Sequence, residues 1–190
     1  MKTFISVLED HQQMINSLVH CTSDIEAAGQ LLLTTLQQGG KILLCGNGGS
    51  AADCQHIAAE LVVRYEYHRR ALAAIALTTD SSILTAHSND YGFDSVYARQ
   101  VEALGVANDV LCAISTSGNS LNIINAAQAA QQKGMKVIVL TGGSGGDLIQ
   151  YATAAIVVPS AITARIQEAH ILIGHWWCAL VENHFKDMPC

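Results

Sequence analysis

The stretch Lys41-Ile-Leu-Leu-Cys-Gly-Asn-Gly-Gly-Ser-Ala-Ala-Asp-Cys-Gln-His-Ile-Ala-Ala-Glu60 decides the fold. Its first five residues, 41–45, form a short apolar run with glycine on both sides, which is typical of a buried strand in a parallel sheet. The glycine turn that follows leads into a helix that we expect to begin near Ser50. This order predicts an α/β fold in which the free N–H groups of the helix N-terminus favour an anion.

Two interpretations of this turn stay open. Phosphate binding is one, because Gly48 and Gly49 permit close approach of the backbone to a ligand. An ordinary turn in which Ser50 caps the helix explains the same residues equally well. The turn spells neither a dinucleotide-binding Gly-x-Gly-x-x-Gly nor a P-loop Gly-Lys-Ser/Thr, so the sequence argues against those two classes.

A second strand, turn and helix follow later in the chain. Residues 109–115 are apolar after Asp109, and a helical pattern runs over 121–133. The loop between them carries hydroxyls that can hydrogen-bond to a phosphate without a positive charge: Ser115, Thr116, Ser117 and Ser120. Ligands of open α/β sheets bind at the carboxyl ends of strands, so here we prefer phosphate or phosphosugar binding to a purely structural turn.

The alternation of apolar strands and helical patterns continues along the chain. We expect strands at 41–45, 73–77, 110–115, 136–141 and 154–158, and helices at 50–64, 81–87, 95–104, 121–133 and 164–184. Two amphipathic helices, 4–20 and 23–38, precede the first strand and are candidates for an oligomer interface. The pattern predicts a parallel sheet of about five strands flanked by helices, with N-terminal helices and a long C-terminal helix.

Composition narrows the class of protein. With 190 residues, 50% hydrophobic and only 14% charged, we expect one domain whose surface is partly buried in an oligomer. The formal charge of -6 argues against a nonspecific nucleic-acid binder. No apolar run is long enough to span a bilayer, and residues 1–13 are too polar for a signal peptide, so we expect a cytoplasmic protein. The six cysteines include no Cys-x-x-Cys pair and are interpreted as reduced thiols.

Two groups of side chains could do chemistry. His56 and Glu60 lie four residues apart, about 40° around a helix, so both can face one site, although a solvated ion pair explains them as well. On the last helix, helical phase does not choose between Gln167 and Glu168 as the neighbour of His175. His175 itself could equally be a core histidine beside two tryptophans.

Several motifs in one order carry a resemblance to a known family: Gly46-Asn-Gly-Gly-Ser50, His56-x-x-x-Glu60, Asn89-Asp90, the loop 115–120, and Arg165-Ile-Gln-Glu168 with His175. Together they resemble the phosphoheptose isomerase (sedoheptulose-7-phosphate isomerase) family of sugar isomerase (SIS) domains over nearly the whole chain.

The resemblance implies a fold, an assembly and an activity. The fold is a flavodoxin-like sheet in one SIS domain over residues 1–190. The assembly is a homotetramer whose active sites combine residues of neighbouring subunits. The activity is conversion of sedoheptulose 7-phosphate to D-glycero-D-manno-heptose 7-phosphate, the entry step to the heptose of lipopolysaccharide and related glycans.

The resemblance also assigns roles to residues. Glu60 and His175 would be the acid–base pair. The substrate phosphate would be held by Ser115, Thr116, Ser117 and Ser120. The sugar would be contacted by Asn47, Gly48, Gly49, Glu60, Asn89, Asp90 and Gln167. Zinc would be bound by His56, Glu60, Gln167 and His175, a set of nitrogen and oxygen donors.

Two other functions stay in view. One is a noncatalytic interaction protein of the kind that associates with a replication initiator. Such relatives lack the residues that match Glu60 and His175, and both are present here, which favours the enzyme. The other is a sugar-phosphate-sensing regulator, for which about 40 residues before the first strand leave little space for a DNA-binding module.

Overall fold

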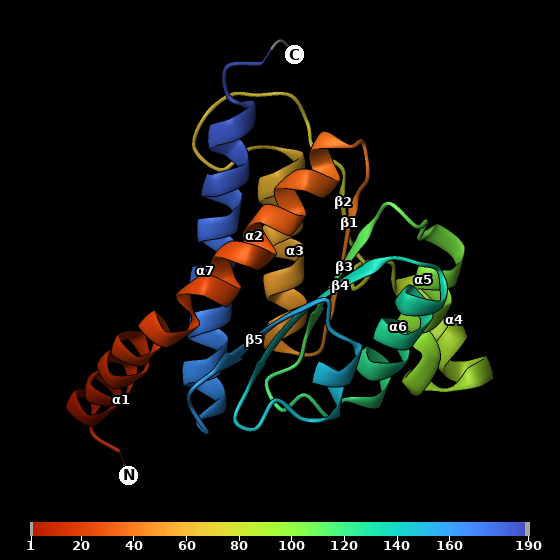
Figure 1. The fold of residues 1–190 in the computed structure, drawn as a ribbon. Coiled ribbons are helices and arrows are strands. Elements are labelled where there is room, and N and C mark those ends of the chain that lie inside the picture. Colours follow the sequence, from red (N-terminus) through yellow and green to blue (C-terminus); the bar gives the residue numbers. More distant parts are fainter. Residues whose placement is uncertain (1, 189–190) are drawn as a thin grey trace.

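The computed structural model describes residues 2–188 and is built on one parallel sheet (Figure 1). Its five strands are β1 (Ile42–Gly46), β2 (Ala74–Ala76), β3 (Val110–Ile114), β4 (Lys136–Gly142) and β5 (Ala154–Val158). They lie in the order β2-β1-β3-β4-β5, and every neighbouring pair is parallel. This is the flavodoxin order, so the predicted fold class is confirmed.

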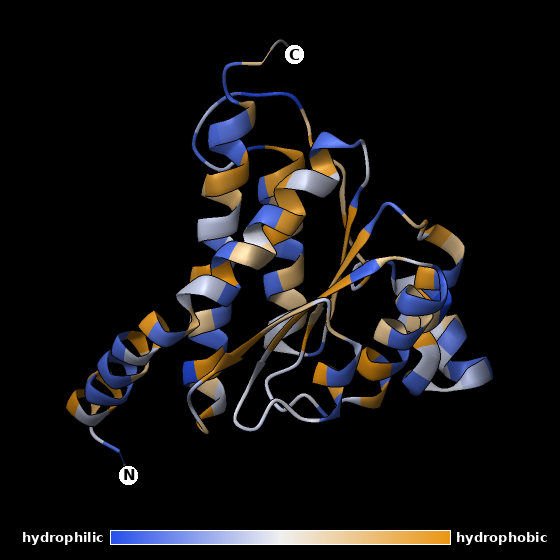
Figure 2. Cartoon of the chain, viewed as in Figure 1, coloured by the Kyte–Doolittle hydropathy of each residue, from blue (hydrophilic) through white to orange (hydrophobic). Residues whose placement is uncertain are grey.

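Helices cover both faces of the sheet, which explains why the central strands β1 and β3 carry no polar side chain (Figures 1 and 2). One layer holds α2 (Thr22–Gln37), α3 (Gly49–Val62) and α7 (Thr163–Phe185), and the other α4 (Ser81–Tyr91), α5 (Val96–Leu104) and α6 (Leu121–Gln132). Ile42 and Leu44 of β1 join the core under the first layer, whereas Leu43 and Cys45 join the core under the second. Side chains of a strand alternate between faces, so β1 contributes to both cores.

Most predicted boundaries hold within two residues, and the larger differences have local causes. The predicted helix 4–20 is α1 (Phe4–Ser17) followed by a 3-10 turn over Leu18–Cys21. The helix predicted at 81–87 continues to Tyr91, because Gly92, with a φ of 92°, ends it only there. Residues Phe93–Ser95 form a separate 3-10 turn before α5. The edge strand β2 pairs over only three residues.

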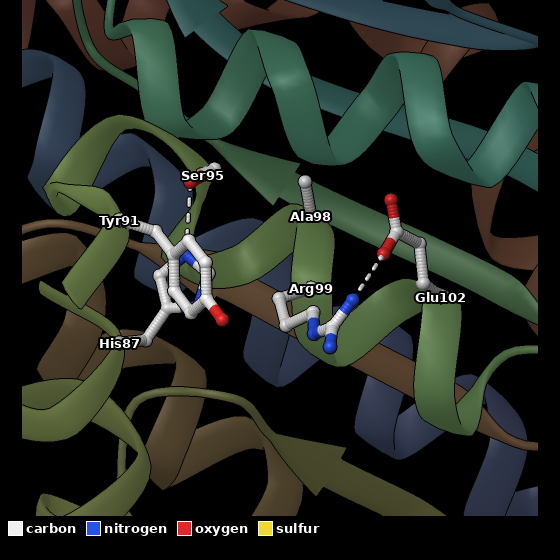
Figure 3. Close-up of a pocket in the computed structure, with 6 residues that line it drawn as sticks. All are labelled: His87, Tyr91, Ser95, Ala98, Arg99 and Glu102. Carbon is white, nitrogen blue, oxygen red and sulfur yellow. Dashed lines mark hydrogen bonds and ion pairs between the residues drawn. The ribbon is translucent and has the colours of Figure 1, made fainter.

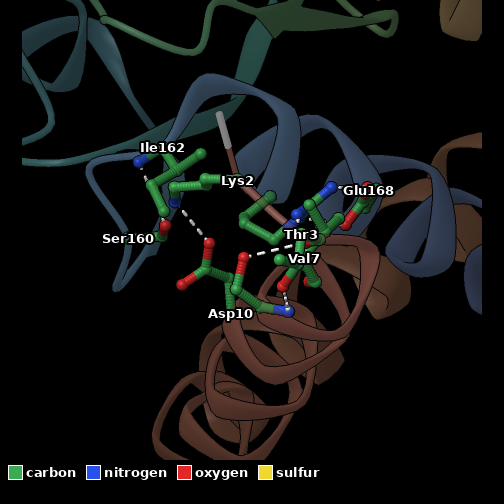
Figure 4. A network of polar contacts seen from close by, with 9 residues as sticks. Lys2, Thr3, Val7, Asp10, Ser160, Ile162 and Glu168 are labelled. Carbon is green, nitrogen blue, oxygen red and sulfur yellow. Dashed lines mark hydrogen bonds and ion pairs between the residues drawn. The ribbon is translucent and has the colours of Figure 1, made fainter.

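Polar contacts fix α1 to the start of α7 (Figure 4). Arg165 donates to Glu168 through Nε and Nη2, and its Nη1 donates to the Val7 carbonyl at 3.3 Å. The other partner of Glu168 is Nδ1 of His11, 2.7 Å from Oε2. Met14 of α1 packs nearby against Ile166 and Ala169 of α7. Glu168 therefore faces α1.

The described cysteines are free and buried. Burial raises the pKa of Cys112 to about 12 and also raises that of Cys45, Cys54 and Cys178. Thiols in such surroundings stay protonated and unreactive, which agrees with their interpretation as reduced thiols. The sixth cysteine, Cys190, lies outside the described residues. Among residues 2–188, none of the helices has the length and apolar character needed to cross a bilayer.

Candidate active site

Three side chains from two helices meet at one point. Nε2 of His56 lies 3.0 Å from Nε2 of His175 and 3.1 Å from Oε1 of Glu60. The His175 nitrogen lies 3.7 Å from the same carboxylate oxygen. The donor atoms of the three residues all lie within 4.8 Å of one another, close enough to hold one metal ion. His56 and Glu60 of α3 thus meet His175 of α7, which the residue pattern alone had left apart and the resemblance to the family had placed together.

The way in which α3 begins places His56 and Glu60 on the face of the helix that lies toward α7. The helix begins at Gly49, and Gly48 precedes it with a φ of 54° and no side-chain cap. Ser50 lies inside the helix, so the alternative in which it is the N-cap is wrong. Because Asp53, His56 and Glu60 follow at intervals of three and four residues, they share one face of α3.

Gln167, rather than Glu168, is the residue of the α7 start that faces the beginning of α3. A Cβ on Gly49 would lie 2.3 Å from Nε2 of Gln167, so only glycine leaves room for this side chain. The Gln167 side chain also lies close enough to Asp53 to act on its carboxyl, where it lowers the pKa. Glu168 is occupied by Arg165 and His11, and the ambiguity of helical phase is resolved.

Asp53 lies beside this cluster, outside its three donor groups, and the sequence analysis missed it. Its side chain is buried, and burial raises the pKa of its carboxyl, although Gln167 and the charges of His56 and His175 act to lower it. Its position three residues before His56 was the available signal, but an acidic residue in the first turns of a helix is ordinary.

A metal ion fits the donor atoms of this cluster. Among the described residues, Oδ2 of Asp53 and Oε2 of Glu60 are buried without a hydrogen-bond partner, which is costly for carboxylate oxygens. The facing histidine nitrogens likewise offer two lone pairs to a shared cation. Imidazole and carboxylate groups in this arrangement are zinc ligands by type.

The hydroxyl loop after β3 is a separate candidate site, where the sequence predicts that a phosphate binds. Within residues 2–188 no side chain caps the N-terminus of α6, because the Ser120 hydroxyl is paired with the buried Ser115 hydroxyl at 3.2 Å. The first N–H groups of α6 thus remain available to an anion. A cavity of about 260 Å³ opens here, lined by Thr116 and Ser117 of the loop and by Gly142, Gly143, Ser144, Ala161, Thr163 and Ile166.

This loop is held in one shape by the neighbouring glycine-rich loop. Gly118 has a φ of 67°, and a Cβ there would lie 1.9 Å from the Gly145 carbonyl oxygen. The Gly118 carbonyl accepts from the N–H of Leu148 at 2.9 Å, and Asn119 Oδ1 accepts from the N–H of Asp147 at 3.1 Å. The hydroxyls are therefore presented by a preorganised backbone.

Asn47 connects the two parts of the site. Its amide exchanges two hydrogen bonds with the amide of Asn122, at 2.9 and 2.8 Å. Asn47 follows β1, and Asn122 lies in the first turn of α6, directly after the hydroxyl loop. Because β1 and β3 are neighbours at the point where the strand order reverses, the pair lies where such sheets bind ligands.

Asn89 and Asp90 lie apart from these groups in the described chain. They hydrogen-bond to each other at 2.8 Å on α4, a helix with no buried residue. On the same helix, His87 stacks on Tyr91 and contacts the Ser95 hydroxyl at 2.8 Å, at a cavity of about 240 Å³ between α4 and α5 (Figure 3). This gives His87 a packing role that the sequence did not supply.

Comparison with known proteins agrees with this geometry. The SIS domain family model matches residues 8–142. Phosphoheptose isomerase of Aliarcobacter butzleri is 52% identical over 93% of this chain and 94% of its own. A phosphoheptose isomerase structure from Neisseria gonorrhoeae is 48% identical with a TM-score of 0.83, covering 95% of both chains. One from Francisella tularensis is 38% identical with a TM-score of 0.88, covering 96% of this chain and all of that one. The family model, these relatives and the fold agree, and the chain belongs to the phosphoheptose isomerase family of SIS-domain proteins.

Proposed function

We propose that this enzyme converts sedoheptulose 7-phosphate to D-glycero-D-manno-heptose 7-phosphate. The observation that carries the proposal is the meeting of Glu60 with His56 and His175. The Asn47–Asn122 pair connects the strand that leads to this cluster with the hydroxyl loop. One part of such a site suits proton transfer at a carbonyl, and the other suits a phosphate.

The phosphate is held by neutral donors. Ser115, Thr116, Ser117 and Ser120 supply hydroxyls, and the uncapped N-terminus of α6 supplies N–H groups and the positive end of its dipole. This arrangement accounts for phosphate binding by a chain whose formal charge is -6. The cavity beside Thr116 and Ser117 gives the phosphate group room.

The sugar lies between the phosphate and the cluster. Asn47, Gly48, Gly49, Asn89, Asp90 and Gln167 contact its hydroxyls. Isomerisation removes a proton from C1 of the ketose and returns a proton to C2, while O1 loses a proton and O2 gains one. Glu60 moves the proton between the carbons, and His175 exchanges protons with the oxygens through an enediol intermediate.

Zinc is the proposed metal, and His56, Glu60, Gln167 and His175 would hold it. When bound, it would supply Lewis-acid polarisation of the substrate carbonyl. Gln167 lies beside the Asp53 carboxyl, and Oε2 of Glu60 is buried without a hydrogen-bond partner among the described residues.

A homotetramer with shared active sites is the proposed assembly. α4 has no buried residue, and Tyr91 and Phe93 at its end are 72% and 50% exposed. A neighbouring subunit that covers α4 would receive Asn89 and Asp90 into its own site. A second apolar cavity, about 340 Å³, lies between η1 (Leu18–Cys21), α2 and α7, where Val19, Leu172 and Trp176 are exposed. This cavity could receive the N-terminal helices of a neighbouring subunit in the same tetramer. The proposed enzyme is cytoplasmic and supplies heptose for lipopolysaccharide or related glycans.

A coupled assay tests substrate and metal together. The purified protein is assayed on sedoheptulose 7-phosphate as isolated, after treatment with a chelator, and after addition of zinc. We expect turnover that the chelator removes and zinc restores. No turnover in any state would overturn the activity, and full turnover in chelator would overturn the metal.

A further inference from the structure

Tyr65 lies against the proposed catalytic histidine. The ring centroids of Tyr65 and His175 are 6.0 Å apart, and the ring planes are inclined by 32°. On another side, the His56 ring approaches His175 edge-on with centroids 5.1 Å apart. His175 is therefore flanked by two rings, one from α3 and one from the turn that follows α3.

His175 depends on such packing, because little else fixes its ring. Within residues 2–188 its one hydrogen bond joins Nε2 to His56, and Nδ1 has no partner. Histidines that bind metal or act in catalysis usually have the second ring nitrogen hydrogen-bonded, which sets the ring orientation. The His175 side chain is also 37% exposed, so ring contacts carry much of the constraint.

A buried carboxylate fixes the turn that carries Tyr65. Glu182 of α7 is 1% exposed, and its oxygens accept the N–H groups of Tyr65, Glu66 and Tyr67 at 2.8, 2.6 and 2.9 Å. Three short bonds to a charged acceptor determine the backbone of this turn. Because Glu182 lies on the same helix as His175, it fixes the position of the Tyr65 turn relative to the His175 ring.

Arg69 ties the turn to the other half of the site. Its Nη2 donates to the Glu60 carbonyl at 2.6 Å, and its Nε lies 3.7 Å from Oε1 of Glu182. The Arg69 side chain is 1% exposed, so this ion pair is shielded from solvent. One buried centre thereby connects the α3 end that bears Glu60, the Tyr65 turn and α7.

We infer that Tyr65, held in place by Glu182 and Arg69, is a positioning residue that orients His175. The inference rests on the proposed role of His175 in proton transfer and metal binding. The tyrosine ring, and not its hydroxyl, performs this task, since the contact with His175 is between rings.

Leucine and phenylalanine substitutions at Tyr65 distinguish an effect of its ring on His175 from a general effect on the fold. Tyr65→Leu removes the ring, and Tyr65→Phe retains it. Tyr67→Leu is the matched control: Tyr67 donates its N–H to the same Glu182, but its ring is 53% exposed and lies under Lys186 Nζ at 5.4 Å. Zinc affinity is measured on the metal-free protein by competition with a chromophoric chelator, and kcat and KM are measured on sedoheptulose 7-phosphate.

We expect Tyr65→Leu to lower zinc affinity and kcat by about tenfold or more, with KM within about twofold, because the phosphate loop is untouched. Tyr65→Phe and Tyr67→Leu should match the unmodified protein. Equal behaviour of Tyr65→Leu and Tyr67→Leu, or an equal loss in Tyr65→Phe, would overturn the inference. If Tyr65→Leu does not fold, Tyr65→Met fills the volume without a ring and takes its place.

Failure of the proposed function gives a different result. In that case the unmodified protein shows no turnover of sedoheptulose 7-phosphate, and the zinc affinities of the three variants still decide the role of Tyr65. If the unmodified protein is active and Tyr65→Leu keeps both zinc affinity and kcat, the function stands and the inference fails.

Discussion

The imidazole rings of His56 and His175 face each other through their Nε2 atoms, 3.0 Å apart. One residue comes from α3 and the other from α7, and Glu60 lies beside both. Two neutral imidazoles in this arrangement share one hydrogen or bind one cation. The pair is thus the structural centre of the site, and its neighbours determine how it works.

Glu60→Gln should abolish turnover while substrate binding survives. The amide keeps the shape of the side chain but cannot accept a proton from carbon, so kcat should fall at least about a hundredfold. Calorimetry with sedoheptulose 7-phosphate should still detect binding through the hydroxyl loop. Glu9→Gln, an exposed position on α1, is the control and should be fully active. Full activity of Glu60→Gln would remove Glu60 from the mechanism.

Asp53→Asn should stabilise the fold and weaken metal binding. Burial raises the pKa of the Asp53 carboxyl, so its ionised form costs native-state stability at neutral pH, and the neutral amide removes that cost. Loss of the charge beside the two histidines should lower zinc affinity about tenfold. Thermal unfolding and chelator competition measure the two effects, and a parallel loss of both stability and affinity would contradict this account.

Gly49→Ala should act by displacing Gln167. The added Cβ would lie 2.3 Å from Gln167 Nε2, and this side-chain end can move, so the fold should survive. We expect kcat to fall about tenfold through loss of the Gln167 position. In a double-mutant cycle, Gly49→Ala added to Gln167→Ala should cost little more than Gln167→Ala alone. Additive losses would show that Gly49 acts independently of Gln167.

Ser117→Ala should weaken substrate binding without slowing the chemistry. A hydrogen bond to a charged group contributes about 1.5–3 kcal/mol, so KM should rise at least about tenfold while kcat is retained. Ser95→Ala removes the hydroxyl that contacts His87, away from the loop, and should leave KM unchanged. A fall in kcat with KM constant would move Ser117 from the phosphate to the reacting end of the sugar.

His170 should make stability depend on pH. Burial lowers its pKa to about 4, although the bond to the Thr141 carbonyl acts to raise it. An unfolded histidine binds a proton near pH 6.5, so the unfolded state binds more protons between pH 6.5 and 4, and native stability falls as pH falls through this range. The loss reaches up to about 3 kcal/mol. His170→Gln can still donate to the Thr141 carbonyl but does not titrate, so it should remove this pH dependence of the free energy of unfolding. Denaturant unfolding at several pH values measures it, and identical curves for the two proteins would contradict the role of His170.

The sequence predicted the parts of the molecule that depend on short stretches of chain. The strand at 41–45 and the helix after it follow from apolar runs and glycines, and His56 and Glu60 share a face because of helical periodicity. The contacts that escaped prediction join distant residues. Glu182 was not singled out by any sequence pattern, yet it accepts three N–H groups more than a hundred positions away.

The choice between neighbouring candidate residues also depended on contacts with distant parts of the chain. Gln167 was selected over Glu168 by what stands opposite each of them: Gly49 leaves space for the amide, and His11 pairs with the carboxylate. Asp53 had an ordinary position in its own helix. The positions of Asn89 and Asp90 relative to a substrate stay a prediction, because the one side-chain hydrogen bond that they make within the described chain joins them to each other.

The length of α7 has a consequence for which sugars are accepted. Ile166 lines the cavity beside Thr116 and Ser117, where we propose that the phosphate binds, and His175 follows nine residues later on one uninterrupted helix, a rise of about 14 Å. No hinge lies between them, so the span between anchor and reacting end is a fixed length. A ketose phosphate with fewer carbons would still bind through its phosphate, but its reacting carbons would not reach Glu60 and His175. Selectivity for the length of the sugar would then appear in kcat.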